Sequence, residues 1–202
     1  MTSSIYCRAW IRFTFILTAL FANTVAQAEP YLSLGGTVYE SAAVNAEIDP
    51  YLLYALTLVE SGKATGDGNV IPWPYVIRAK DARIYASDEA EYRAAWKLFS
   101  LKYGDRIDVG PAQVNVYWQA TRAKKVTSPD ELLDYETNLN VAAEVLKEAI
   151  DSTDNLALGI GRYHSWGDQE RALLFGKRVL AVHQNLVAQT GAIPATNLKP
   201  LE

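Results

Sequence analysis

A helix whose two ends are both marked in the sequence occupies residues 49–62. Asp49 and Pro50 form a typical start, because aspartate caps a helix N-terminus and proline suits the first turn. The following run is apolar, and Gly62 favours an end after Ser61. Such a helix needs a packed core to cover its apolar stripe, and a chain that is 50% hydrophobic can supply one.

Glu60 is the unusual residue of this helix. Leu53, Leu56 and Glu60 are spaced three and four residues apart, so the carboxyl projects from the apolar stripe. Burial and the negative end of the helix dipole both disfavour the charged form, so we expect a raised pKa for this group. A carboxyl that stays protonated near neutral pH can work as a general acid. The simpler interpretation is a solvated cap or half of an ion pair, which is the usual role of a lone Glu near a helix end.

The remaining segments are mostly helical in pattern. We predict helices over residues 31–45, 88–103, 136–150, 155–165 and 168–189, and a further helix that begins near Gly110 because Pro111 follows it. Residues 75–79 and 82–86 are short and rich in β-branched and aromatic side chains, which predicts a small hairpin. The fold class is therefore mostly α (α+β), and the sequence gives no sign of repeats or of a second domain.

The N-terminus has the pattern of a secretory signal peptide. Arg8 and Arg12 precede the apolar run FTFILTALFANTV, and small residues follow it up to Ala28. The run is shorter than the roughly 20 residues of a spanning helix, so cleavage after Ala28 is favoured over an uncleaved anchor. We therefore predict a signal peptide at 1–28, one domain at 29–190 and a flexible tail at 191–202, with no stable membrane anchor after cleavage.

Composition limits the chemistry that the mature chain can perform. Cys7 is the only cysteine and lies in the predicted signal peptide, so no disulfide, thiolate nucleophile or cysteine metal site is expected. The net charge is −4 and no basic run stands out, which argues against nucleic acid as a partner. His164 and His183 are too few and too far apart to indicate a metal site, and His183 is expected on the exposed or half-buried side of its helix. No cofactor is implied.

Three short motifs follow one another at intervals of about fifty residues. They are Glu60-Ser61, then Gly110-Pro111-Ala112-Gln113 with Asn115, then Arg162-Tyr163-His164. This ordered set resembles the soluble-lytic-transglycosylase family, whose fold is related to goose-type lysozyme and whose motifs are Glu-Ser, Gly-Leu-Met-Gln with a downstream Asn, and Ala-Tyr-Asn. Asp134 and Asn138 also look like the start of a helix in that family. The IPWP tract is similar to members that accompany conjugation and type IV secretion systems.

The resemblance implies a lysozyme-like helical domain with a small β-hairpin insertion that acts on peptidoglycan in the periplasm. The implied reaction cleaves the β-1,4 bond between N-acetylmuramic acid and N-acetylglucosamine and leaves a 1,6-anhydromuramoyl end. A single carboxyl suffices when the substrate's acetamido group assists, so Glu60 would act first as acid and then as base. Residues implied to contact the substrate are Ser61, Gln113, Asn115 and Tyr163.

Other interpretations of the same residues remain open. Pro111-Ala112 and Arg162 with His164 depart from the family pattern, so a catalytically weak glycan-binding or scaffold module is the first alternative. A lysozyme-type hydrolase is the second, if Asp105 or Asp108 approaches the scissile bond. A helical binder of a small hydrophobic ligand is the third.

Two residue roles are also undecided in the sequence. Ser61 either positions Glu60 or caps the helix end. The aromatic residues Tyr117, Trp118 and Trp166 could stack on sugar rings, although core packing is the more common role for such side chains.

Overall fold

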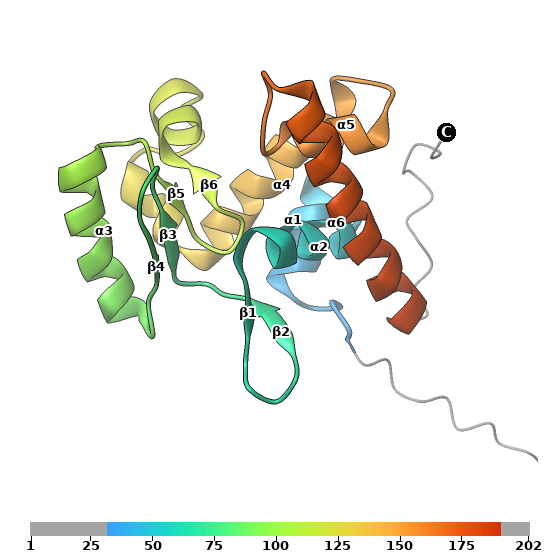
Figure 1. Cartoon of the computed structure of the whole chain (residues 1–202), viewed down its shortest axis with the longest axis horizontal. Helices are drawn as coiled ribbons and strands as arrows, with labels where there is room; N and C mark the ends of the chain where they lie inside the picture. Colours follow the sequence, from blue (N-terminus) through green and yellow to red (C-terminus); the bar gives the residue numbers. More distant parts are fainter. Residues whose placement is uncertain (1–31, 191–202) are drawn as a thin grey trace, which may run out of the picture.

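Helices form most of residues 32–190, the part of the chain that the computed structural model describes (Figure 1). The small sheets are antiparallel, so the predicted class, mostly α with some β, is confirmed. The signal peptide predicted at 1–28 and the tail predicted at 191–202 lie outside the described residues. Within residues 32–190, none of the helices combines the length and apolar character needed to cross a membrane.

Most helices begin directly after a capping side chain, but the helix predicted over residues 31–45 begins only at Val38, after its cap Thr37. Their bounds are α1 Val38–Asn45, α2 Pro50–Ser61, α3 Glu89–Tyr103, α4 Tyr135–Asp151, α5 Leu156–Arg162 and α6 Gln169–Thr190, with a π-helix η1 Tyr117–Arg122 and a 3-10 helix η2 Pro129–Leu133. Asp49 caps α2, because its Oδ1 accepts a 2.7 Å hydrogen bond from the backbone N–H of Tyr51. Asp134 caps α4 in the same way through Thr137, and this bond lowers the pKa of Asp134.

The strands form one pair and one four-stranded sheet. The pair is β1 Gly62–Ala64 with β2 Val70–Pro72, and the sheet contains β3 Val76–Arg78, β4 Arg83–Tyr85, β5 Asp108–Val109 and β6 Val114–Asn115 in the order β4-β3-β5-β6. The hairpin predicted from residues 75–86 is present as β3 and β4. The sheet is larger than that hairpin, because β5 pairs with β3 and β6 pairs with β5.

The helix predicted to begin near Gly110 is wrong. Gly110 has a φ of +77° and starts the turn that joins β5 to β6, and Gln113 ends that turn with a φ of +49°. A side chain at Gly110 would overlap the amide of Asn138, so both the backbone angle and the space require glycine here. Helical structure resumes only after β6, at Tyr117.

The core is built around α2, whose Leu52, Leu53 and Leu56 are fully buried. Helix α6 packs against both α2 and α5. At the crossing of α5 and α6, a Cβ on Gly176 would overlap the carbonyl oxygen of Ala157. The glycine in the middle of α6 therefore allows two helix backbones to touch, which explains why the helix contains it despite its low helix propensity.

His183 is buried, which corrects the prediction of an exposed or half-buried position. The residue is 5% exposed, and its Nε2 lies 3.2 Å from Oδ2 of Asp49. The contact joins the middle of α6 to the N-terminal cap of α2. It therefore fixes the start of the helix that carries Glu60 in its last turn.

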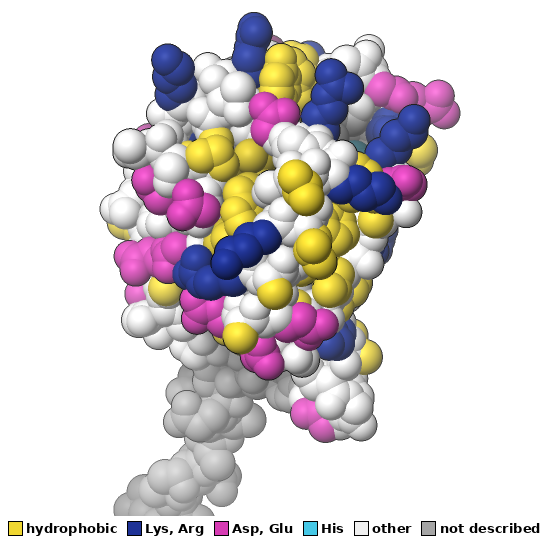
Figure 2. Space-filling view, turned by 90° about the vertical axis from the view of Figure 1, so that its left-hand side faces the viewer, with side chains coloured by type: hydrophobic (Ala, Val, Ile, Leu, Met, Phe, Trp, Pro, Cys, Tyr) yellow, Lys and Arg dark blue, Asp and Glu magenta, His cyan; other side chains and the backbone are white. Residues whose placement is uncertain are grey.

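The outer side of α3 carries exposed apolar side chains. Leu98 and Leu101 are 69% and 87% exposed, respectively. Figure 2 views the molecule from the side on which α3 lies and shows hydrophobic side chains among Lys, Arg, Asp and Glu. This surface is separate from the cavity described next.

Candidate active site

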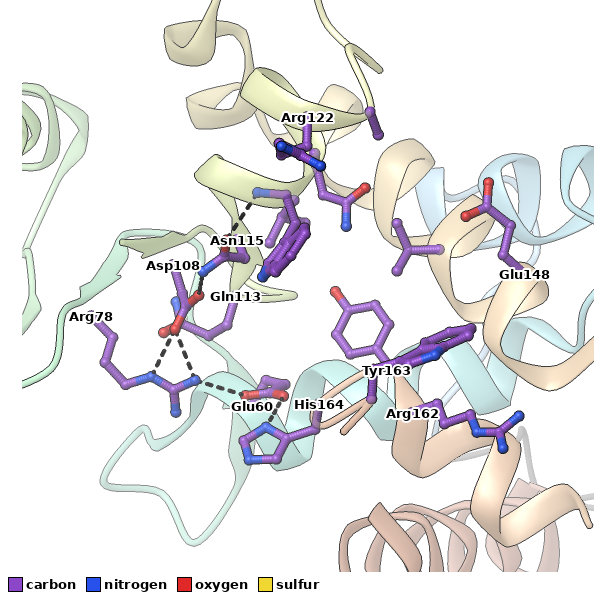
Figure 3. Close-up of a pocket in the computed structure, with 16 residues that line it drawn as sticks. Glu60, Arg78, Asp108, Gln113, Asn115, Arg122, Glu148, Arg162, Tyr163 and His164 are labelled. Atoms are coloured by element: carbon purple, nitrogen blue, oxygen red, sulfur yellow. Dashed lines mark hydrogen bonds and ion pairs between the residues drawn. The ribbon is translucent and has the colours of Figure 1, made fainter. Parts of the chain in front are cut away.

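A cavity of about 790 Å³ lies where α2, the four-stranded sheet, η1, α4 and the end of α5 meet (Figure 3). Four of the predicted site residues line its wall: Glu60, Gln113, Asn115 and Tyr163. These residues come from three motifs about fifty residues apart in the sequence, so the fold gathers them in one place.

Glu60 lies at the last turn of α2 and is 7% exposed, so its predicted burial is confirmed. The two carboxylate oxygens have different partners: Oε1 lies 3.3 Å from Nδ1 of His164, and Oε2 lies 3.9 Å from Nη2 of Arg78. Figure 3 shows Arg78 and His164 reaching the carboxylate from separate elements.

Arg78 is fixed by a second carboxylate. Its Nε and Nη2 donate to Oδ2 of Asp108 at 3.2 and 3.0 Å, and Nδ2 of Asn115 donates to the other oxygen of Asp108 at 2.7 Å. The strand register produces this network, because Arg78 is opposite Asp108 and Asp108 is opposite Asn115. Both oxygens of Asp108 are thus occupied by protein donors.

Asp105, the other carboxylate considered as a second catalytic group, is directed elsewhere. Its Oδ2 accepts a 2.9 Å hydrogen bond from the hydroxyl of Thr121, and the residue is not part of the cavity wall. The pair Asp105 and Thr121 holds η1 to the loop before β5.

Gln113 lies in the cavity wall and has a buried acceptor oxygen without a partner among the described residues. The side chain is buried, with 5% of the residue exposed, and its Nε2 donates to the carbonyl oxygens of Gly110 and Val76 at 2.9 and 3.3 Å. Its Oε1 has no hydrogen-bond partner among residues 32–190. A buried carbonyl oxygen without a partner costs free energy, so an N–H donor on a ligand would satisfy it.

Asn138 holds the turn that carries Gln113. The residue is fully buried; its Oδ1 accepts from the backbone N–H of Ala112 at 3.2 Å, and its Nδ2 donates to Val109 and Leu132 at 2.9 Å each. All hydrogen-bonding atoms of this amide therefore have partners. Asn138, which the sequence resemblance singled out only as part of a helix, positions the cavity wall from behind.

Tyr163 lines the cavity and also supports the same turn. Its hydroxyl donates to the carbonyl oxygen of Ala112 at 2.8 Å, and not to Glu60. Burial, with a smaller contribution from the negative charge of Glu60, raises the pKa of Tyr163 well above its ordinary value of 10.0. The group is therefore a neutral phenol at any physiological pH.

Ser61 does not reach the cavity. The residue is fully buried, and its hydroxyl donates to the carbonyl oxygen of Thr57 one turn earlier in α2, at 3.0 Å. The side chain faces the core and is not part of the cavity wall, where the predicted contact with a substrate would have to be made. Of the two roles considered for Ser61, the geometry matches the cap of the helix end, because the hydroxyl bonds a carbonyl oxygen in the last turns of α2.

Two of the three aromatic residues considered for sugar stacking are not core side chains. Trp118 and Trp166 are 57% and 62% exposed and both line the cavity, so core packing is the wrong interpretation for them. Tyr117 meets Trp118 edge-on with ring centres 5.0 Å apart. The guanidinium of Arg162 lies 5.5 Å from the centre of the Trp166 ring. The two exposed indoles offer flat apolar surfaces to a ligand.

Sequence reasoning missed Arg78 as a member of the site. The signal was present, because an arginine in a strand expected to pack on a core needs a carboxylate partner. His164 appeared only as a departure from a motif, although it contacts Glu60. Among the described residues, no group of three or more His, Cys, Asp or Glu side chains gathers in a way that could hold a metal ion.

Comparisons with protein-family models, with curated proteins and with solved structures give no match for this chain. A functional assignment therefore has to be argued from the motifs and from the geometry of the cavity.

Proposed function

We propose that the protein is an exported lytic transglycosylase that cleaves peptidoglycan glycan strands, with Glu60 as acid and base. The observation that carries this proposal is the state of the carboxylates in the cavity wall. Of the described residues there, Glu60 is the one buried carboxylate, whereas Asp108 is held on both oxygens by Arg78 and Asn115.

The proposed reaction needs only this one carboxyl. Glu60 in its acid form donates a proton to the glycosidic oxygen as the bond from C1 of N-acetylmuramic acid to that oxygen breaks. The acetamido group of the same sugar supports the positive charge at C1. The 6-hydroxyl oxygen then bonds to C1, and its proton passes to the Glu60 carboxylate. The products are a 1,6-anhydro end and the regenerated acid, and no water is consumed.

The engagement of Asp108 is also what disfavours the lysozyme-type alternative. A hydrolase of the usual kind needs a second carboxylate as a base or a nucleophile near C1. A carboxylate that accepts three hydrogen bonds from Arg78 and Asn115 has no free oxygen to offer.

The cavity wall is also suited to an amino sugar. Oε1 of Gln113 can accept from an acetamido N–H, and the exposed faces of Trp118 and Trp166 can cover sugar rings. The charged side chains of Arg78, Asp108 and Arg122 in the wall make a small hydrophobic ligand a poor fit.

The proposed location and partners of the protein rest on the sequence alone. A cleaved signal peptide at 1–28 would deliver the enzyme to the periplasm, where its substrate lies. The IPWP tract resembles family members that accompany conjugation and type IV secretion systems. We therefore associate the enzyme with local opening of the cell wall for such an apparatus.

The test is mass spectrometry of soluble products from purified peptidoglycan, with the mature protein and Glu60→Gln in parallel. We expect anhydromuropeptides from the wild type and at least about a thousandfold loss in the variant, because the acid and the base are removed together. Glu144→Gln is the matched control, because Glu144 is an exposed carboxylate on α4 that pairs with Lys125 outside the cavity wall.

The other products each have a distinct meaning. Reducing-end muropeptides would identify a hydrolase and contradict the transglycosylase proposal. Absence of products, together with retained binding to the peptidoglycan, would leave a glycan-binding module.

A further inference from the structure

The two oxygens of Glu60 are not equivalent. Oε2 faces Arg78, a guanidinium that has five N–H donors and no acceptor. Oε1 faces Nδ1 of His164, an atom that can donate or accept depending on the protonation of the ring. A proton on Oε2 would point at a donor and a positive charge, whereas a proton on Oε1 has an acceptor 3.3 Å away.

The imidazole is held in this orientation by packing. Its ring stacks on Phe175 of α6, with ring centres 4.6 Å apart and an angle of 3° between the planes. The side chain of His164 is 27% exposed, so the ring is in contact with both Glu60 and solvent. Protons can therefore enter and leave the imidazole without displacing the buried carboxyl.

We propose that Glu60 and His164 share the acid proton and that His164 supplies it to Oε1, an inference that rests on the proposed transglycosylase function. His164 does not touch the substrate in this scheme and is a positioning residue that acts through Glu60. His164 stands where the motif of the resembled family has Asn. The departure from that motif thus changes how Glu60 is kept protonated.

The pair can hold one proton in two arrangements. In one, Oε1–H of neutral Glu60 donates to Nδ1, and Nε2 of the ring carries its own proton. In the other, the imidazolium donates Nδ1–H to the Glu60 carboxylate. The two forms differ only in the position of one proton between Nδ1 and Oε1, so the titration belongs to the pair.

The reaction uses this proton without net gain or loss. The proton moves from Nδ1 to Oε1, the ring becomes neutral, and Oε1–H passes the proton to the glycosidic oxygen as the bond to C1 breaks. The proton of the 6-hydroxyl group then arrives on the carboxylate when the oxygen bonds to C1. It is shared again with Nδ1, which restores the starting pair.

The charged groups around the pair explain why a partner is needed. Arg78 favours the carboxylate form of Glu60, and Asp108 offsets part of that charge. Tyr163 is neutral, and Phe175 is the side chain of α6 that meets the ring. Arg162, two residues before His164, lines the same cavity, and its guanidinium donates to Ser152. An imidazole beside Oε1 gives the acid proton a second site, on the side of the carboxyl that Arg78 does not face.

The test is the pH profile of product release for the wild type and for His164→Asn. The amide keeps a polar side chain but does not titrate, so the alkaline limb of the profile should move to lower pH by at least about one unit. Activity at pH 5 should stay within a few-fold of the wild type, while activity at pH 7.5 should fall at least about tenfold. Lys177→Gln, an exposed charge change on α6, is the control and should leave the profile unchanged.

The outcomes separate this inference from the proposed function. If the wild type is active and the pH profile of His164→Asn runs parallel to that of the wild type, the proton-sharing role is overturned and the transglycosylase proposal stands. A wild type without products at any pH would contradict the proposed function instead.

A second measurement still tests the pair if the wild type gives no products or if His164→Asn fails to fold. The ring ¹⁵N signals of His164 are followed against pH in the wild type and in Glu60→Gln, and only one other histidine, the buried His183, needs to be told apart from it. We expect the variant to change the pH dependence of the His164 signals. Identical titrations in the two proteins would overturn the inference whether or not the protein is active.

Discussion

Asp108 sets how strongly Arg78 acts on Glu60. In Asp108→Asn the hydrogen bond from Asn115 can be kept, but the negative charge that offsets Arg78 is lost. Arg78 then stabilises the Glu60 carboxylate more strongly, so less of the protonated acid is present near neutral pH. We expect product release at pH 7.5 to fall by about tenfold, equivalent to about 1.4 kcal/mol, with a smaller loss at pH 5.

The pH dependence of this loss is the informative part of the measurement. If Asp108→Asn removed activity equally at pH 5 and pH 7.5, Asp108 would itself be a catalytic group. The hydrolase interpretation would then replace the one-carboxylate mechanism.

At the level of single residues, the sequence predicted those side chains whose role depends on local pattern. The position of Glu60 on the apolar stripe of α2 is a helix-period argument, and its burial followed from that. Arg78 was missed because its place beside Glu60 depends on the pairing of β3 with β5, thirty residues further along the chain. Ser61 was misplaced because a motif match does not say on which side of the helix end a side chain points.

The crossing of α5 and α6 makes a prediction at the level of elements. Gly176→Ala would place a methyl group against the carbonyl oxygen of Ala157, and backbone atoms cannot move aside as a flexible side chain can. We expect the free energy of unfolding in urea to fall by about 1–3 kcal/mol, although alanine is the better helix former. Leu174→Ala in the same helix is the control, because Leu174 is 66% exposed and should change stability little. Unchanged stability in Gly176→Ala would mean that the helices are not in backbone contact.

Helices and strands differed in how far the sequence predicted them. Helix α2 begins directly after the predicted cap Asp49, and α3 begins after Asp88, as the capping rules indicate. Helix α4 begins after the cap Asp134, one residue before its predicted start. The two-residue strands β5 and β6 carry too little pattern to be recognised. Pro111, which suggests a helix start, instead follows a glycine at positive φ in a turn, and that turn is specified by the distant Asn138.

For the whole molecule, the cavity depends on contacts between distant parts of the chain. α2 brings Glu60, the sheet brings Arg78 and Asp108, and the end of α5 brings His164. Two of these parts, α2 and the sheet, are held by buried polar contacts that are long-range in sequence. Asn138 holds the turn between β5 and β6, and the pair His183 and Asp49 holds α2 to α6.

The last of these contacts gives a prediction for the stability of the whole fold. His183→Ala leaves the buried Asp49 without its imidazole partner, while the cap bond from Tyr51 to the other oxygen remains. Because unfolding of a domain this size is usually cooperative, we expect the loss to appear as a fall of about 2–4 kcal/mol in the global free energy of unfolding. Asp49→Asn keeps a good cap but removes the charge. When it is combined with His183→Ala, it should therefore lower the free energy of unfolding by less than it does alone. Additive losses would mean that the two side chains do not interact.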